Sequence, residues 1–312
     1  MPQQFQASLI AFGLHYLCID IHHKLMAYNN KYSKSELATL HSTLHEILSE
    51  VIRICNKHDI PYYMIGGSAI GAFFYNDIIP FDDDIDIGMT RSNYERFLNV
   101  APAELSPGYF LQWVGTDRHT PYYFAKVRKD NTLFIEDSVK NIGMHHGIFV
   151  DIFPMDKVPD NPTLQHIQRK AANFFNECLV AKEVWLWKYC GKCEIEIPNR
   201  HGFVNCLLNR IVISILPKRK IYNILRHIQA LFNSGNKHTY YNIVMTKVDH
   251  IAVKDVENLQ AVRFGDAEAY VPNNVETYLR HHYPNLRKEI PEEEQVTHRP
   301  MILSFDAQSS TK

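Results

Sequence analysis

The stretch GGSAIGAFFYNDIIPFDDDIDIGM, residues 66–89, contains the features that decide the fold of this chain. Its second half alternates acidic and apolar side chains, which is typical of a β-strand with one polar and one apolar face. On such a strand Asp82, Asp84 and Asp86 share one face, and Ile85 and Ile87 share the other. Carboxylates in a row repel one another unless a cation compensates them, and hard oxygen ligands select Mg²⁺ or Mn²⁺. The sequence therefore predicts a metal site on this strand.

Three other interpretations of the acidic run compete with a metal site. A solvated acidic loop is the usual explanation of a charge run, but it does not require the apolar alternation seen here. An EF-hand calcium loop starting at Asp82 requires glycine at its sixth position and glutamate at its twelfth, where the chain has Ile87 and Asn93. A glycosyltransferase can also use an Asp-x-Asp pair to hold the metal of a nucleotide-sugar, and this alternative stays open.

The start of the same stretch has the composition of a phosphate-binding turn. Gly66, Gly67 and Ser68 follow the apolar run 62–65, which predicts a strand that ends in a turn. Residues without side chains let backbone N–H groups approach phosphate oxygens, and the Ser68 hydroxyl adds a further donor. Together with the acidic strand, this turn favours phosphoryl or nucleotidyl transfer.

A third carboxylate is expected on the segment 148–153, which alternates as a strand. There Asp151 shares one face with two phenylalanines, and an acid in that position is costly to bury unless it is paired. A two-metal site needs a carboxylate from an adjacent strand, so Asp151 is the candidate partner of Asp84 and Asp86. The alternative is a structural role, in which Asp151 accepts hydrogen bonds from a neighbouring loop.

Two basic side chains and two histidines lie close to these motifs in the sequence. Lys126 and Arg128 are two apart on the expected strand 122–129, so they point to the same side and could grip a pyrophosphate. A surface ion pair is the alternative for both. His145 and His146 precede the third carboxylate, and one of them could donate to a phosphate oxygen.

Helical and extended segments alternate around the motifs. A helix is expected between a Ser33-x-x-Glu36 capping box and Pro61, because apolar side chains recur at three- and four-residue spacing from Leu37 to Cys55. Shorter helices are expected over 69–74 and 91–100. Further strands are expected over 109–114 and 132–136, and residues 163–260 read as helical.

Composition narrows the class of protein. The 312 residues are 46% hydrophobic, which is enough for a substantial core. The 33 basic and 34 acidic side chains nearly cancel, so no global field favours nucleic acid as a partner. The apolar segment 5–21 is short of a bilayer span and has no basic leader, which leaves peripheral membrane contact as its possible membrane role.

The cysteines agree with a cytoplasmic location, with the inner face of the membrane as the alternative. The six cysteines are scattered, as is usual for reduced thiols. Cys190 and Cys193 form a C-x-x-C pair, so a zinc site that includes Cys178 and Cys206 stays open.

Several blocks of the chain, in order, resemble the signature of the LicD family, the phosphocholine transferases related to fukutin and fukutin-related protein. The blocks are the run GGSAIGAFFYNDIIPFDDDIDIGMTRSNYERF, the runs 123–128 and 146–156, and the C-terminal Phe264-Gly265-Asp266, 291–293 and His298. The resemblance covers roughly residues 36–300. It departs at Ala69-Ile70, where the family often has a Thr-Leu-Leu-type run, and at Phe81, where it often has Trp. Both changes keep the apolar character, so they affect the shape of the pocket and leave metal binding intact.

The resemblance implies an α+β fold with a nucleotidyltransferase core like that of DNA polymerase β. In such a fold a mixed sheet is flanked by helices, and an additional helical region follows. With the residue patterns, four parts are expected: an N-terminal helical extension (1–35), the catalytic core (36–160), a helical region with a C-terminal segment that closes over the site (161–306), and a disordered tail (307–312). The core and the closing C-terminal segment are what the resemblance implies.

The resemblance also implies a metal-dependent phosphotransferase that uses Mg²⁺ or Mn²⁺. It would move an alcohol phosphate, first of all phosphocholine, from a CDP-linked donor to a hydroxyl of a cell-surface glycan or glycolipid such as lipopolysaccharide or teichoic acid. The implied catalytic residues and metal ligands are Asp84, Asp86 and Asp151, and one of these carboxylates is the first candidate for the general base. The implied donor-binding residues are Gly66, Gly67, Ser68, Lys126, Arg128, His146 and His298. A nucleotide-sugar glycosyltransferase and an inactive binding protein of the same fold are the alternatives.

Overall fold

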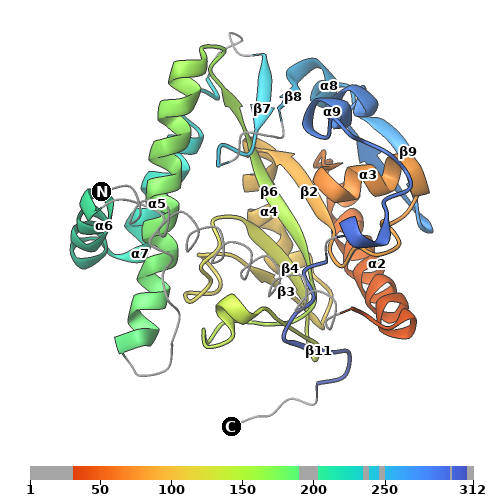
Figure 1. Ribbon diagram of the computed structural model, residues 1–312, viewed down its shortest axis with the longest axis horizontal. Helices are drawn as coiled ribbons and strands as arrows, with labels where there is room; N and C mark the ends of the chain where they lie inside the picture. Colours follow the sequence, from red (N-terminus) through yellow and green to blue (C-terminus); the bar gives the residue numbers. More distant parts are fainter. Residues whose placement is uncertain (1–30, 190–202, 235–238, 246–249, 296, 308–312) are drawn as a thin grey trace, which may run out of the picture.

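The computed structural model describes residues 31–189, 203–234, 239–245, 250–295 and 297–307. Within them the chain forms an α+β fold, as expected, in which a curled mixed sheet is flanked by helices (Figure 1). The helices are α2 (Lys34–Lys57), α3 (Gly66–Tyr75), α4 (Arg91–Glu104), α5 (Pro162–Tyr189), α6 (Phe203–Ile215), α7 (Lys218–Gln229), α8 (Val253–Glu257) and α9 (Val275–His282), with 3₁₀ turns η1 (Asp137–Val139) and η2 (Glu292–Glu294). The strands are β1 (Tyr63–Met64), β2 (Asp86–Thr90), β3 (Tyr109–Gln112), β4 (Ala125–Lys129), β5 (Leu133–Ile135), β6 (Phe149–Val158), β7 (Tyr240–Asn242), β8 (Ile251–Ala252), β9 (Gln260–Phe264), β10 (Ala267–Val271) and β11 (Ile302–Ser304).

The main sheet is built around the long strand β6. Its order is β1-β2-β6-β4-β3, and β7 pairs with the far half of β6 and carries β8. The pairing of β2 with β6 is parallel, whereas the other pairings are antiparallel. Two small sheets complete the described structure, one from β9 and β10 and one from β5 and β11.

Helix α2 forms as its sequence predicts. Ser33 accepts a hydrogen bond from the Glu36 backbone, and the Glu36 side chain accepts one from the Ser33 backbone, so the capping box is present. The helix buries its apolar stripe, in which Leu40, Ile47 and Leu48 are fully enclosed. It packs against β6 and β4 and thereby covers one face of the sheet.

Three local expectations were wrong. The acidic strand begins at Asp86 rather than at Asp82, because Asp82 bonds back to Ile79 in a turn and the residues before Asp86 form a loop. Helix α3 begins at Gly66, so the glycines lie in its first turn and not in a turn before it. The segment expected to be helical up to residue 260 also contributes β7 and β8, which pair with β6 and with each other.

The helices after β6 have a core of their own. Helix α5 packs against α6 and α7 on one side of the molecule, as Figure 1 shows. Val158 at the end of β6 belongs to this apolar cluster, together with Leu179, Ile221 and Leu225. The segment after residue 160 is therefore joined to the sheet through both β6 and β7.

Several expectations from the sequence concern residues that the structure does not describe. The expected N-terminal helical extension, up to residue 30, and the tail 308–312 are not among the described residues. The same holds for Cys190, Cys193 and the side chain of Cys206, whereas Cys178 is a buried thiol that bonds to Asn209. In the part of the chain that is described, no helix has both the length and the apolar character needed to span a bilayer.

Candidate functional site

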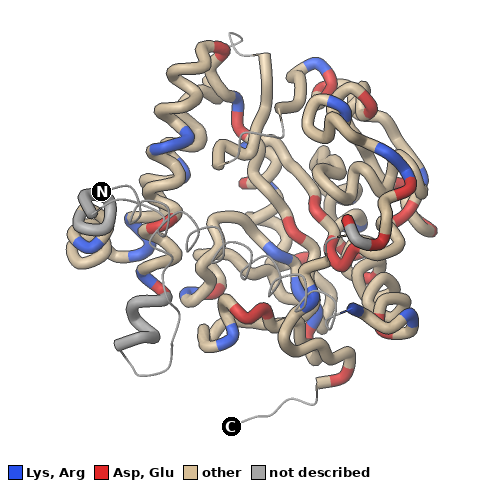
Figure 2. Tube along the Cα trace, viewed as in Figure 1, with Lys and Arg blue, Asp and Glu red and all other residues tan. Residues whose placement is uncertain are grey.

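Parallel pairing of β2 with β6 places two acidic side chains directly opposite each other. Asp86 and Asp151 are partners in the register, and the Asp151 backbone N–H donates to the Ile85 carbonyl at 2.9 Å. Opposed residues on neighbouring strands project to the same face of a sheet. The structure thus brings together two of the three predicted metal ligands. Figure 2 shows acidic and basic positions meeting in the middle of the molecule, where β2, β6 and β4 run side by side.

The loop before β2 adds the other carboxylates. Asp83 is 1% exposed; its Oδ2 accepts a hydrogen bond from the Tyr32 hydroxyl at 2.8 Å. Its Oδ1 has no hydrogen-bond partner among the described residues, and the Nδ1 of His298 lies 4.0 Å away. Ligand atoms of Asp83, Asp84 and His298 all lie within 4.8 Å of one another. His298 therefore lies beside the acidic loop.

Burial and mutual repulsion shift the acid–base properties of the loop carboxylates. Burial raises the pKa of Asp82 to about 7, and the charge of Asp83 adds to the effect. Burial also raises the pKa of Asp84 to about 7, with further contributions from the charges of Asp82, Asp83 and Asp151. Without a cation, part of this loop is protonated near neutral pH.

The pKa is also raised for the two acids that lie opposite each other on β2 and β6. Burial raises the pKa of Asp86 well above its usual range; the charges of Asp84 and Asp151 raise it further, and Lys126 opposes them. Burial also raises the pKa of Asp151, against the effect of Lys126. Clustered oxygen donors that are costly to ionise, with a buried Asp83 oxygen that lacks a partner, fit a hard divalent cation such as Mg²⁺ or Mn²⁺.

The first two glycines of α3 face these carboxylates. Gly66 has φ +54°, and a Cβ there would lie 3.7 Å from Asp86 Oδ2. A Cβ on Gly67 would lie 2.8 Å from Asp82 Oδ2, so a side chain at that position would displace the acid. The Ser68 hydroxyl accepts a hydrogen bond from the Asp86 backbone at 2.8 Å. The first turn of α3 is therefore shaped to receive oxygen-rich groups, since its N-terminal N–H groups favour negative charge.

Lys126 and Arg128 are buried, and both engage protein partners. Lys126 is 3% exposed and donates to both carboxylate oxygens of Asp151, at 2.6 and 2.9 Å. Arg128 is 1% exposed and donates to Gln112 Oε1 at 2.6 Å and to the Gly147 carbonyl at 2.5 Å. A direct contact of either side chain with a pyrophosphate, as predicted from the sequence, would require it to leave these partners.

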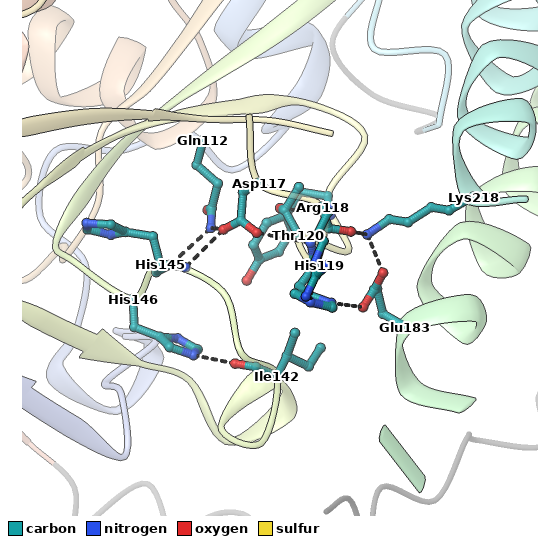
Figure 3. A network of polar contacts seen from close by, with 11 residues as sticks. Gln112, Asp117, Arg118, His119, Thr120, Ile142, His145, His146, Glu183 and Lys218 are labelled. Atoms are coloured by element: carbon teal, nitrogen blue, oxygen red, sulfur yellow. Dashed lines mark hydrogen bonds and ion pairs between the residues drawn. The ribbon is translucent and has the colours of Figure 1, made fainter. Parts of the chain in front are cut away.

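His145 and His146 belong to a polar network beside the strands (Figure 3). Within the described residues their rings bond to Asp130 and to the Ile142 carbonyl, and not to the predicted metal ligands. The His146 Nε2 bonds to the Ile142 carbonyl at 2.8 Å, and burial lowers the pKa of its ring. The His145 backbone N–H donates to Asp117, which also accepts from Gln112. His146 therefore lies apart from the acids that the sequence places a few residues away.

The same network reaches the helical region. The His119 backbone N–H donates to Asp117, and the His119 ring pairs with Glu183 of α5 at 3.2 Å (Figure 3). Lys218 of α7 donates to Glu183 at 2.6 Å and to the Arg118 carbonyl at 2.7 Å. These contacts attach the loop between β3 and β4 to α5 and α7.

The segment that carries the acidic loop and strands β2, β4 and β6 also matches a known protein family. Residues 59–189 match the family described as "LicD/FKTN/FKRP, nucleotidyltransferase domain". This chain carries a LicD-family domain. The domain contains α3, β2, β4 and the carboxylates Asp84, Asp86 and Asp151.

The matches to individual relatives cover only part of each relative's length. A protein of Haemophilus influenzae named lipopolysaccharide cholinephosphotransferase LicD is 32% identical over 45% of this chain and 52% of its own length. Uncharacterized proteins of Rickettsia typhi and Rickettsia prowazekii are 28% and 26% identical over 42% and 40% of this chain. These two matches cover 39% and 43% of the rickettsial proteins, so the chain spans about half or less of the relatives it matches.

Several residues that shape the site have no signal in the sequence. The Gly66 backbone N–H donates to the Tyr278 hydroxyl at 3.0 Å, across 212 positions of sequence. His41 bonds to the Asp82 carbonyl at 2.8 Å, and Tyr32 bonds to Asp83. Their partners lie too far along the chain for any local pattern to connect them.

Proposed function

We propose that this protein is a LicD-type transferase that moves an alcohol phosphate, first of all phosphocholine, from a CDP-linked donor to a hydroxyl of a glycan or glycolipid. Membership of the LicD family and the name of the Haemophilus relative support phosphocholine transfer to lipopolysaccharide at a coarse level. The CDP form of the donor follows from the family resemblance, and the dependence on metal is inferred from the carboxylates of the site.

One observation carries the proposal: Asp86 and Asp151 face each other on parallel strands, next to the first turn of α3. The succession β1, α3, β2 and the acid on the neighbouring strand β6 agree with a nucleotidyltransferase core. Such sites need acidic side chains from two strands beside an anion-binding backbone, because phosphoryl transfer depends on positioning and charge compensation.

The chain's own groups have separable roles in this proposal. The N–H groups in the first turn of α3 orient the donor pyrophosphate. Asp84 and Asp86, with Asp151 as the third carboxylate beside them, would provide the charge for a divalent ion that offsets charge on the phosphoryl group. The acceptor oxygen bonds to the phosphorus of the alcohol phosphate, while the bond from that phosphorus to CMP breaks. The hydroxyl proton passes to a carboxylate of the cluster, which acts as the base.

The C-terminal segment contributes side chains beside the carboxylates. Helix α9 packs on α3 and supplies Tyr278 to the Gly66 backbone, while His298 reaches Asp83. Arg299 donates to Glu36 at 2.9 Å and thereby fastens this segment to the start of α2. We infer that His298 contacts the donor from this side.

The test is to incubate the purified protein with Mg²⁺, lipopolysaccharide and separate CDP-choline, CDP-ribitol and UDP-sugar donors. We expect CMP release and phosphocholine incorporation with CDP-choline, and neither with Asp86→Asn. UDP release with sugar incorporation would instead identify a glycosyltransferase. Binding of CDP-choline without turnover under any of these conditions would identify an inactive member of the fold.

A further inference from the structure

We propose that Lys126 is the permanent counter-ion of Asp151, so that the site holds one divalent cation, at Asp84 and Asp86, and a lysine ammonium in place of a second one. The inference rests on the proposed function, because it concerns the cation that the carboxylate cluster would bind. It changes the role of Asp151 from a metal ligand to one half of a resident ion pair.

The sheet register places Lys126, Asp151 and Asp86 in one row. Lys126 of β4 is opposite Asp151 of β6, and Asp151 is opposite Asp86 of β2. Residues opposed in this way project to the same face. Asp151 therefore lies between the carboxylate that would bind metal and the Lys126 amine, whose pKa burial lowers and the charge of Asp151 raises.

The ion pair uses both oxygens of Asp151. The Lys126 ammonium lies 2.6 Å from Oδ1 and 2.9 Å from Oδ2, and the two residues are 3% and 7% exposed. A divalent cation bound to the same carboxylate would face the ammonium at short range, where the low dielectric of a buried site strengthens repulsion. Metal binding at Asp151 and the observed ion pair are therefore in competition.

Aromatic rings hold the ammonium in place. The Lys126 Nζ lies 3.4 Å from the ring centre of Phe149, 4.6 Å from that of Tyr122 and 5.1 Å from that of Phe124. Cations are attracted to the faces of such rings, and most strongly where water is excluded. Withdrawal from Asp151 would give up these contacts as well as the ion pair, so the ammonium stays with the carboxylate when metal arrives.

The positive charges divide between two pairs of partners, while Asp82 and Asp83 are carboxylates whose pKa burial raises. Asp151 is neutralised by Lys126, and the two charges of Asp84 and Asp86 match one divalent cation. Arg128 provides the contrast on the same face of β4. It is also buried, and its guanidinium lies 4.7 Å from the ring centre of Phe149, but its hydrogen bonds go to the uncharged Gln112 and Gly147.

The experiment is a Mn²⁺ titration followed by electron paramagnetic resonance and calorimetry. We expect wild-type protein to bind one Mn²⁺ per chain. Lys126→Met keeps an unbranched apolar side chain among the rings and removes the counter-ion of Asp151. The variant protein should therefore bind a second Mn²⁺, or bind the first about tenfold more tightly. Arg128→Met, the matched control, removes a buried cation without freeing an acid and should keep one site of wild-type affinity.

A double variant keeps the test decisive if Lys126→Met does not fold. Lys126→Met with Asp151→Asn removes both charges and should bind one Mn²⁺ with the wild-type affinity. A loss of about tenfold or more in the double variant would overturn the inference, because Asp151 would then be a ligand. So would two equivalent Mn²⁺ sites in the wild type, or an unchanged titration of a folded Lys126→Met. If the wild type binds no Mn²⁺ at all, the metal dependence of the proposed function fails with it.

Discussion

Replacing Asp84 with asparagine should stabilise the metal-free protein at pH 8 while abolishing turnover. Burial and the charges of Asp82, Asp83 and Asp151 raise the pKa of Asp84 from 3.8 to about 7, and His298 only partly opposes them. At about 1.36 kcal/mol per pKa unit, ionising this carboxyl costs the folded state up to about 4 kcal/mol. Since neighbouring acids in the cluster adjust their protonation together, we expect a gain of about 1–3 kcal/mol in the free energy of unfolding.

The sign of the pH dependence follows from the raised pKa. The contribution of neutral Asp84 to stability is complete below pH 3.8 and is lost as the pH rises through about 7. Urea unfolding in EDTA at pH 5 and pH 8 should therefore show a larger drop in stability for the wild type than for Asp84→Asn. Mg²⁺ at pH 8 should restore more stability to the wild type than to the variant.

An exposed acid supplies the control. Asp306→Asn removes one negative charge at the C-terminal end of the described chain and should not change the pH dependence. If Asp84→Asn lowers the free energy of unfolding at pH 8 in EDTA, repulsion within the cluster does not govern its stability. Turnover near the wild-type rate in saturating Mg²⁺ would refute the assignment of Asp84 to the metal site.

Three further variants test the scaffold. Arg91→Met removes the cation that binds the 1%-exposed Asp156 carboxylate at 2.9 and 2.5 Å and leaves it the amide of Asn233, so it should cost about 3–5 kcal/mol in urea unfolding. A cost below about 1 kcal/mol would mean the pair behaves as an exposed one. Gly265→Ala places a Cβ 2.5 Å from His45 Cε1 in a residue whose φ is +61°. The clash and the backbone strain together should lower the free energy of unfolding by about 1–3 kcal/mol. Adding His45→Ala should restore only the part of this loss that is due to the clash. Ser33→Ala removes the cap of α2 and should cost about 1 kcal/mol by thermal denaturation, whereas no change would show that the cap is dispensable.

Local patterns in the sequence were sufficient for features that depend on near neighbours. The capping box of α2 and its apolar stripe were both predicted and found, because helix formation is decided by residues three and four positions apart. The acidic motif and its link to a carboxylate at Asp151 were also visible, since an acid between two phenylalanines stands out on any strand. The motif blocks were specific enough to indicate the LicD family.

The tertiary structure decided where the carboxylates lie and what neutralises them. The sequence did not show that β2 and β6 pair in parallel with Asp86 opposite Asp151, because register is set by packing between segments 65 residues apart. Nor did it show that Lys126 turns toward Asp151 among aromatic rings rather than toward solvent. A strand pattern states which side a residue faces, but only the neighbouring strands determine whether that side meets water, a ligand or an opposite charge.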